Sequence, residues 1–180
     1  MKIISKILSH RCSLIGYDTR NEETVQKIVD NIPSKIIFDN VFSKEKYIEY
    51  FTSKEVIREI KLIELLDESV SINIILNLNN LKNEDDNRLF SQSRDIRELV
   101  NFLNSKLYQL STDGRNIKLI LLNSIYTAFD NGYEKSMLIG GSDPLYSSDY
   151  CVYLERNNLT VIKDRNDFES RIQISNLIFE

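Results

Sequence analysis

The chain has 180 residues, of which 42% are hydrophobic and 28% are charged, and its formal net charge is −4. This balance excludes a disordered chain, and the length suits one buried core, so we expect a single domain over residues 1–180. The negative charge argues against a protein whose main task is to hold nucleic acid, because such proteins usually present a basic surface to the phosphates.

The cysteine and histidine content argues against a zinc site. Cys12 and Cys151 lie far apart, without a Cys-x-x-Cys pair, and the chain has a single histidine. This pattern favours reduced thiols in a reducing compartment. No apolar run approaches the ~20 residues that a membrane helix needs, and the first residues lack the pattern of a signal peptide. We therefore expect a cytoplasmic protein without a metal site.

The first two thirds of the chain alternate between strand and helix patterns. Pro33 ends the second helix, and residues 117–122 are almost wholly apolar, as expected of a central strand covered on both faces. In chain order we expect a helix over 3–10, a strand over 13–17, a helix over 22–32, a strand over 35–39, a long helix opened by Ser43, a strand over 71–78, a helix over 89–110 and a strand over 117–122.

The last third is predicted to be rich in strands. A loop of about fifteen residues follows residue 122, and a short helical or turn segment comes next. Strands are expected over 150–155, 159–163 and 171–179, with Asn157-Asn158 as a hairpin turn because asparagine tolerates positive φ. Strand and helix alternation followed by a β meander is the pattern of an open α/β sheet with antiparallel additions.

Residues 138–165, LIGGSDPLYSSDYCVYLERNNLTVIKDR, carry a recognisable motif. They resemble the C-terminal part of the RecA-type recombinase core, and most closely the UvsX-type phage recombinases. The similarity is specific between about residues 117 and 166, and elsewhere it extends only to the order of elements. It implies a RecA-like, open and mainly parallel sheet flanked by helices, with a C-terminal antiparallel meander. The pattern G-G-x-x-P-x-Y-S-x-D of that family is met by Gly140 and Gly141, which form a structural turn, and by Pro144, Tyr146, Ser147 and Asp149.

The chain departs from the family at the residues that ATP hydrolysis needs. No G-x-x-x-x-G-K-[ST] motif occurs, so the main phosphate grip of a P-loop enzyme is missing. We therefore expect no enzyme activity and no cofactor, with ATP present only if a partner subunit supplies it. The degenerate ATPase positions that the resemblance implies are Asn77 for the Walker B carboxylate, Ser124 for the phosphate sensor, and Asp18 and Arg20 in the catalytic-glutamate segment, with Glu22 and Glu23 close by.

The missing P-loop segment predicts a gap in the sheet. In the RecA core the P-loop strand lies beside the sensor strand, so the resemblance implies a vacancy between the strands at 117–122 and 150–154. Residues 1–11 look like the helix that normally follows the P-loop, which makes the chain truncated at its N-terminus relative to the family. Proteins rarely leave such edges open. Either the sheet closes up, or the N-terminal residues fill the gap, or another chain supplies a strand. Of these we expect the two strands to pair directly, or another chain to supply a strand.

A basic pair near the C-terminus has two interpretations. The resemblance implies that Lys163 and Arg165 reach across a filament interface to a neighbour's ATP phosphates. The alternative is an exposed hairpin whose charges are simply solvated.

The segment 125–139 also has two interpretations. The resemblance implies a loop that contacts single-stranded DNA, with aromatic side chains that stack on bases. The alternative is a mobile loop, because its one lysine stands against two acidic residues and the electrostatic attraction is weak. The DNA-contact residues implied are Tyr126, Phe129, Tyr133 and Lys135.

Three functional hypotheses follow. The first is a non-catalytic RecA/UvsX-like protein of phage recombination, repair or replication that associates with a recombinase or a related partner. The second is the P-loop-less half of a split recombinase, which binds ATP and single-stranded DNA only in assembly. The third is a repurposed binding module that inhibits or regulates a host protein. All three imply a protein partner or a homo-oligomer, weak contact with DNA, no membrane, and, for a phage protein, the cytoplasm of the host cell.

Overall fold

The computed structural model describes residues 2–38, 52–63, 71–81, 89–130, 132–139, 141–164, 171–173, 177 and 179. The helices are α1 (Ile3–Leu8), α2 (Glu22–Asn31), α3 (Ser53–Ile63), α4 (Leu89–Thr112) and α5 (Asp143–Ser147), with 3₁₀ turns η1 (Thr19–Asn21) and η2 (Leu78–Asn80). The strands are β1 (Cys12–Tyr17), β2 (Lys35–Phe38), β3 (Ile72–Asn77), β4 (Ile117–Asp130), β5 (Tyr133–Leu138), β6 (Tyr150–Glu155), β7 (Asn158–Asp164) and β8 (Arg171–Gln173).

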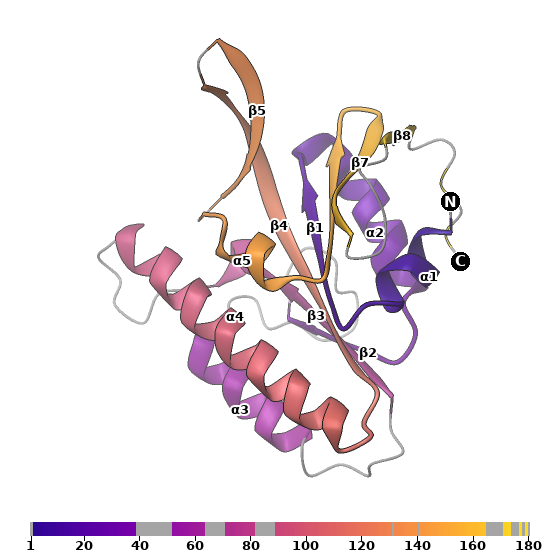
Figure 1. The fold of residues 1–180 in the computed structure, drawn as a ribbon, viewed down its shortest axis with the longest axis vertical. Coiled ribbons are helices and arrows are strands. Elements are labelled where there is room, and N and C mark those ends of the chain that lie inside the picture. Colours follow the sequence, from indigo (N-terminus) through magenta and orange to yellow (C-terminus); the bar gives the residue numbers. More distant parts are fainter. Residues whose placement is uncertain are drawn as a thin grey trace.

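The strands form a mixed, mostly parallel sheet between two layers of helices (Figure 1). In the described residues the sheet has eight strands in the order β2-β3-β4-β1-β6-β7-β8, and β5 pairs with β4. The pairs β6–β7 and β7–β8 are antiparallel. This confirms the predicted α/β class with a C-terminal antiparallel addition. None of the helices in the described ranges is both long and apolar enough to cross a membrane.

Strand β1 occupies the centre of the sheet. It runs parallel to β4 on one side and to β6 on the other, with Leu14 opposite both Leu121 and Cys151. The predicted vacancy is therefore wrong, as is the expectation that the strands at 117–122 and 150–154 pair directly or receive a strand from another chain. All six residues of β1 are buried, since their side chains are small or apolar enough to be covered on both faces of the sheet.

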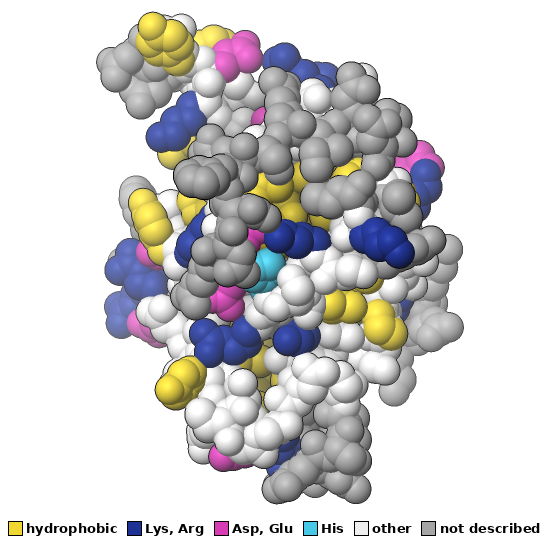
Figure 2. Space-filling view, turned by 45° about the vertical axis from the view of Figure 1, so that its right-hand side comes forward, with side chains coloured by type: hydrophobic (Ala, Val, Ile, Leu, Met, Phe, Trp, Pro, Cys, Tyr) yellow, Lys and Arg dark blue, Asp and Glu magenta, His cyan; other side chains and the backbone are white. Residues whose placement is uncertain are grey.

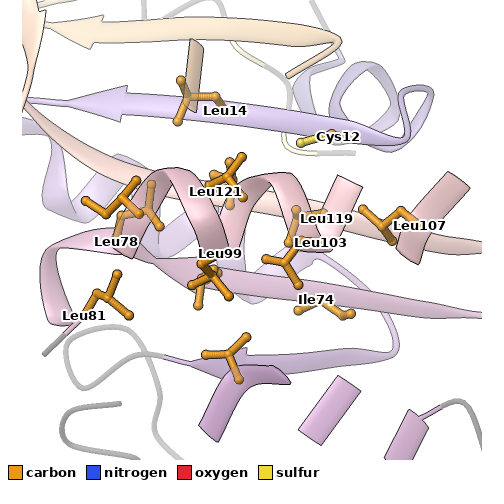
Figure 3. Packing of buried hydrophobic residues seen from close by; sticks show 14 of the residues in the cluster. Cys12, Leu14, Ile74, Leu78, Leu81, Leu99, Leu103, Leu107, Leu119 and Leu121 are labelled. Carbon is orange, nitrogen blue, oxygen red and sulfur yellow. The ribbon is translucent and has the colours of Figure 1, made fainter. Parts of the chain in front are cut away.

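Successive residues of β1 face the two layers of helices. Leu14 belongs to the core under α3 and α4, and Ile15 to the core under α1 and α2, because neighbouring side chains of a strand point to opposite faces. Helix α4 presents a stripe of apolar residues to the sheet, and Figure 3 shows three of them, Leu99, Leu103 and Leu107, beside Leu119 and Leu121. This stripe follows the predicted helical spacing.

The segment after residue 122 is not a loop, as the sequence predicted, but a β-hairpin. Strand β4 continues to Asp130, and β5 returns antiparallel to it, from Tyr133 opposite Asp130 to Leu138 opposite Ile125. Gly132 lies in the turn with φ +83°, in the left-handed region that favours glycine. The hairpin projects from the body at the top of Figure 1. Apolar and charged residues are mixed in this segment, a composition that also occurs in loops, so the sequence pattern alone does not indicate a hairpin.

The turn between β6 and β7 lies one residue earlier than predicted. Glu155 pairs with Asn158, so the two-residue turn is Arg156-Asn157 rather than Asn157-Asn158. Arg156 has φ +54°, an uncommon value for a residue with a Cβ. The turn thereby places an arginine at the carboxyl end of β6, beside the carboxyl ends of β1 and β4.

Candidate functional site

The chain reverses its direction across the sheet between β1 and β4. Strand β1 continues through α2 to the far edge at β2, whereas β4 continues through β5 and α5 to β6 on the other side of β1. Ligands of open α/β sheets bind outside the carboxyl ends of the strands at such a switch point. A cavity of about 350 Å³ lies at this position and is called the switch-point cavity below. Its lining residues are Asp18, Ile125, Tyr126, Thr127, Glu134, Ser136, Glu155 and Arg156.

Asp18, directly after β1, is held by three hydrogen bonds. Its Oδ1 accepts from the main-chain N–H of Arg20 at 3.1 Å and from Nδ2 of Asn21 at 2.7 Å. Its Oδ2 accepts from the main-chain N–H of Arg156 at 3.0 Å. The N-terminal end of a helical segment attracts anions, because its N–H groups are unpaired and its dipole is positive there. The Asp18 carboxylate itself supplies that negative charge at the start of η1.

The predicted sensor and Walker B positions lie in a network of neutral side chains at the same edge of the sheet. Asn77 is 1% exposed, and its Oδ1 accepts from the N–H of Asn79 at the start of η2. Asn79 Oδ1 accepts from the N–H of Ser124 at 3.0 Å, and Asn79 Nδ2 donates to the hydroxyl of Tyr17 at 3.1 Å. These amides join the carboxyl ends of β3, β4 and β1 by hydrogen bonds between uncharged groups.

Metal binding finds no support in the part of the chain that the structure describes. No three His, Cys, Asp or Glu side chains of these residues group together as a metal site would require. Arg20, the remaining predicted ATPase position, is exposed, and only its main-chain N–H contacts Asp18. The structure therefore brings Asp18, Asn77 and Ser124 to one edge of the sheet, and leaves Arg20 exposed.

The hairpin carries most of the exposed apolar side chains. Of the eight large hydrophobic residues that are exposed in the described parts of the chain, five lie on it or directly after it: Tyr126, Phe129, Tyr133, Met137 and Ile139. Figure 2 shows apolar side chains at the upper end of the molecule, where Figure 1 places the hairpin. Such a concentration marks a binding surface more often than a solvated loop.

The residues predicted to contact DNA are divided between the two faces of the hairpin. Residues opposite each other in an antiparallel pair share a face, and successive residues alternate. Tyr126, Tyr133 and Lys135 therefore lie on one face. Phe129 lies on the other face with Thr127, and that face carries Glu134 and closes the switch-point cavity.

Arg156 joins the hairpin to the body of the protein. Its guanidinium lies 3.3 Å from Glu134 Oε2 of β5, while its main-chain N–H binds Asp18 after β1. Sequence reasoning missed both Arg156 and Glu155, because they line the cavity only once the hairpin has folded over the carboxyl ends of β1 and β6. The one signal in the sequence is an arginine beside a predicted hairpin turn.

The structure gives Lys163 a role inside its own chain. Its ammonium group donates hydrogen bonds to the carbonyl oxygens of Leu145, Tyr146 and Ser148, at the C-terminal end of α5. An ammonium group has three N–H bonds, so these acceptors use all of them. Arg165 and Gly140 lie outside the described residues. Gly141 has φ +104°, a conformation that favours glycine.

A second polar cluster surrounds the chain's one histidine, visible in cyan in Figure 2. The His10 ring is buried and stacks on Tyr150, with ring centroids 4.9 Å apart. Its Nδ1 lies 2.9 Å from the carbonyl oxygen of Lys6, and its Nε2 lies 3.5 Å from Oδ1 of Asp164. Lys6 also pairs with Asp164 at 2.8 Å. This cluster ties α1 to the end of β7 and lies apart from the switch-point cavity.

Both cysteines are buried thiols. Burial, reinforced by the nearby Asp149 carboxylate, raises the pKa of Cys12 to about 12, and burial raises the pKa of Cys151 well above its usual range. The nucleophilic form of cysteine is the thiolate, so neither side chain is reactive near neutral pH. The structure records both as free cysteines.

No protein-family model and no curated protein matches this chain. The class of the protein is therefore described from its geometry. It is an α/β protein with a mostly parallel sheet, and a cavity at the carboxyl ends of the strands is lined in part by a projecting hairpin.

Proposed function

We propose that this protein is a non-catalytic relative of the UvsX/RecA-type recombinases, which acts in phage recombination, repair or replication by associating with a recombinase or a related partner. The observation that carries this proposal is the position of Asp18. Its carboxylate accepts hydrogen bonds from Arg20, Asn21 and Arg156 at the edge of the sheet where an anionic ligand would be expected. A carboxylate in this position repels a phosphate group, which supports the non-catalytic part of the proposal.

The strand order supports the recombinase part of the proposal. The resemblance expects the P-loop strand beside the sensor strand, and β1 lies beside β4 with β6 on its other side. In this proposal, residues 12–17 take the place of the P-loop strand, and Asp18 and the η1 turn take the place of the phosphate loop. The segment 18–23 is then a replacement for that loop rather than for the catalytic-glutamate segment.

The fold bears differently on the two alternative functions, the split recombinase and the repurposed binding module. A split recombinase was motivated by a vacant central place in the sheet, and β1 of the same chain occupies that place, so we do not propose it further. A repurposed binding module is a second candidate. The exposed aromatic side chains of the hairpin, Phe129 and Tyr133 above all, favour it as much as they favour a recombinase partner, because both functions need a binding surface.

The test is reconstitution with a purified UvsX-type recombinase on oligothymidine in the presence of ATP. We expect the chain to co-sediment with the recombinase filament, or to change the rate at which the recombinase hydrolyses ATP, while the chain alone hydrolyses none. If neither effect is seen, the recombinase part fails and the binding-module candidate takes its place. ATP turnover by the chain alone that persists through repurification would overturn the non-catalytic part.

A further inference from the structure

The β4–β5 hairpin beyond the body of the sheet is an incomplete structural unit. A two-stranded ribbon is marginally stable in water unless its apolar side chains are covered. Phe129, near the end of the ribbon, is 76% exposed. We propose that the face of the hairpin bearing Phe129, together with the switch-point cavity beneath it, is the docking surface for a protein segment that carries a lysine or arginine beside apolar residues.

The inference deepens the proposed function and rests on it for the existence of a protein partner. It concerns one face only. Phe129 shares this face with Thr127 on β4 and with Glu134 and Ser136 on β5, because these residues oppose each other in the register of the pair. The cavity begins where this face meets the carboxyl ends of β1 and β6. An apolar anchor and a polar cavity are therefore continuous along one surface.

The charge of the surface identifies the chemistry of the segment. The cavity is lined by three carboxylates, Asp18, Glu134 and Glu155, and by one guanidinium, Arg156. Among these described residues the carboxylates outnumber the guanidinium, and a partly enclosed site focuses the resulting negative potential. A cationic side chain is attracted to it, whereas a phosphate is repelled. Hydroxyl groups of Thr127 and Ser136 provide additional hydrogen-bonding partners in the lining.

The same charges argue against single-stranded DNA as the occupant of this face. Binding to a nucleic-acid backbone depends on Lys and Arg side chains that neutralise phosphates. Among the described residues that line the cavity, the one basic side chain is Arg156, which pairs with Glu134. Lys135 lies on the opposite face of the hairpin. A basic protein segment therefore fits the Phe129 face better than a nucleic acid does.

The walls of the cavity are held in place before a partner arrives. Arg156 binds Asp18 of the body through its N–H and Glu134 of the hairpin through its guanidinium. Ile125, at the base of the hairpin, is buried against Gly16 of β1. A preorganised site loses less conformational entropy on binding. The volume of about 350 Å³ lies within the range of about 300–1,000 Å³ that is usual for small-ligand sites, and so has room for one long basic side chain.

The experiment uses three labelled probes with the full chain: a short peptide of alternating arginine and valine, the same peptide with glutamate in place of arginine, and oligothymidine. We expect the arginine peptide to bind with the highest affinity and to shift the amide resonances of Thr127, Ser136 and Arg156. Phe129→Ser and Glu155→Gln should each weaken it by about tenfold, as expected for anchor residues.

Matched controls lie on the exposed surface of the helices. Leu62→Ser removes an exposed apolar side chain from α3, and Glu98→Gln removes an exposed carboxylate from α4, and neither should change peptide affinity. A resonance spectrum of each variant shows whether the fold is intact. The inference is overturned if the glutamate peptide binds equally well, if oligothymidine binds this face more tightly, if the hairpin variants behave like the controls, or if the face is covered by a second copy of the chain.

The two proposals fail in different ways. Peptide binding at the hairpin without recombinase association leaves this inference intact and removes the recombinase part of the proposed function. The opposite outcome is that the chain associates with the recombinase but does not bind the peptide, and that Phe129→Ser and Glu155→Gln do not weaken the association. That outcome removes this inference and leaves the proposed function intact.

Discussion

The main-chain N–H of Arg156 donates a hydrogen bond of 3.0 Å to Oδ2 of Asp18, which joins two residues that are 138 positions apart in the sequence. This bond connects the turn after β6 to the segment after β1, at the carboxyl edge of the sheet. The guanidinium of Arg156 extends the connection to Glu134 of the hairpin. Three segments that meet only in the folded protein are thus fixed around the switch-point cavity.

Replacing Asp18 tests this connection. Asp18→Ala removes the acceptor of two main-chain N–H groups and of the Asn21 amide, so we expect the free energy of unfolding to fall by about 1–2 kcal/mol. Chemical denaturation measures the change. Asp30→Ala is the control, because Asp30 is an exposed residue of α2 whose carboxylate accepts only from Gln26 on the same helix, and its loss should have a much smaller effect. Equal effects of the two substitutions would contradict the structural role of Asp18.

Nucleotide should neither bind to the chain alone nor be hydrolysed by it. The reason is that Asp18 already places a negative charge at the start of η1, and Asn77 is neutral where a magnesium ligand would need a carboxylate. Isothermal calorimetry and a phosphate-release assay check this, with ATP and magnesium in excess. Turnover that disappears in Glu22→Gln or Glu23→Gln would contradict this prediction and would give that glutamate the catalytic role.

Gly16 allows two side chains to close over the centre of β1. A Cβ added there would lie 2.7 Å from Cδ1 of Tyr153 and 2.9 Å from Cγ2 of Ile125. Gly16→Ala should therefore lower the free energy of unfolding by about 1–3 kcal/mol through overpacking, and should loosen the base of the hairpin. Thermal unfolding is the measurement, with Lys61→Ala on the exposed side of α3 as the control. A stability equal to that of the unmodified chain would mean that Tyr153 moves aside without cost.

Alkaline pH should destabilise the fold. Burial raises the pKa of Cys12 from 9.0 to about 12 and raises the pKa values of Cys151, Tyr150 and Tyr153 above their usual ranges. The unfolded chain thus loses protons at lower pH than the folded chain, so the stability is complete below about pH 9 and falls as the pH rises toward 12. Denaturation at a series of pH values measures this.

The same thiols provide an independent control for the alkaline prediction. At pH 8 a thiol reagent should label neither cysteine in the native protein and both after denaturation, since burial keeps them protonated and covered. The double variant Cys12→Ala/Cys151→Ala should lose stability less steeply between pH 9 and 12. An identical slope would assign the effect to the tyrosines instead.

Single-stranded DNA should bind no more tightly than micromolar at physiological salt. The chain has a net charge of −4, Lys135 of the hairpin stands next to Glu134, and Arg156 in the β6–β7 turn pairs with that same Glu134. Anisotropy of labelled oligothymidine at several salt concentrations measures the affinity. Nanomolar binding with a steep dependence on salt would reverse the prediction and would make the face with Tyr126, Tyr133 and Lys135 the DNA-binding surface.

The elements of the fold could be predicted where a single periodicity covers a whole segment. The strand expected over 71–78 is β3 at Ile72–Asn77, and the helix expected over 89–110 is α4 at Leu89–Thr112. The place of β1 could not be predicted, because a buried apolar strand is compatible with any central position and its neighbours are decided by pairing across the whole chain. The hairpin was missed for a local reason. Apolar and charged residues are mixed in residues 125–139, a composition that also occurs in loops.

The site was predicted in part. Asp18 and Ser124 were singled out and do lie at one edge of the sheet, where Asp18 accepts from Arg156 and the N–H of Ser124 donates to Asn79. The partners of Lys163 could not be read from the sequence, because main-chain carbonyl groups become a binding site only when α5 ends beside β7. Arg156 was missed for a similar reason, since a turn residue carries no sign of the two carboxylates that it will meet.

The central position of β1 decides the order in which the protein can form. Cys12 and Asp149, which are 137 positions apart in the sequence, exchange two hydrogen bonds. During synthesis β1 leaves the ribosome well before β4 and β6, the two strands on which it pairs. The apolar strand β1 therefore stays unpaired until most of the chain has been translated. The centre of the sheet can form only after β4 and β6 have been synthesised. A nascent chain of this protein is expected to need a chaperone over that interval more than a protein whose central strand is made last.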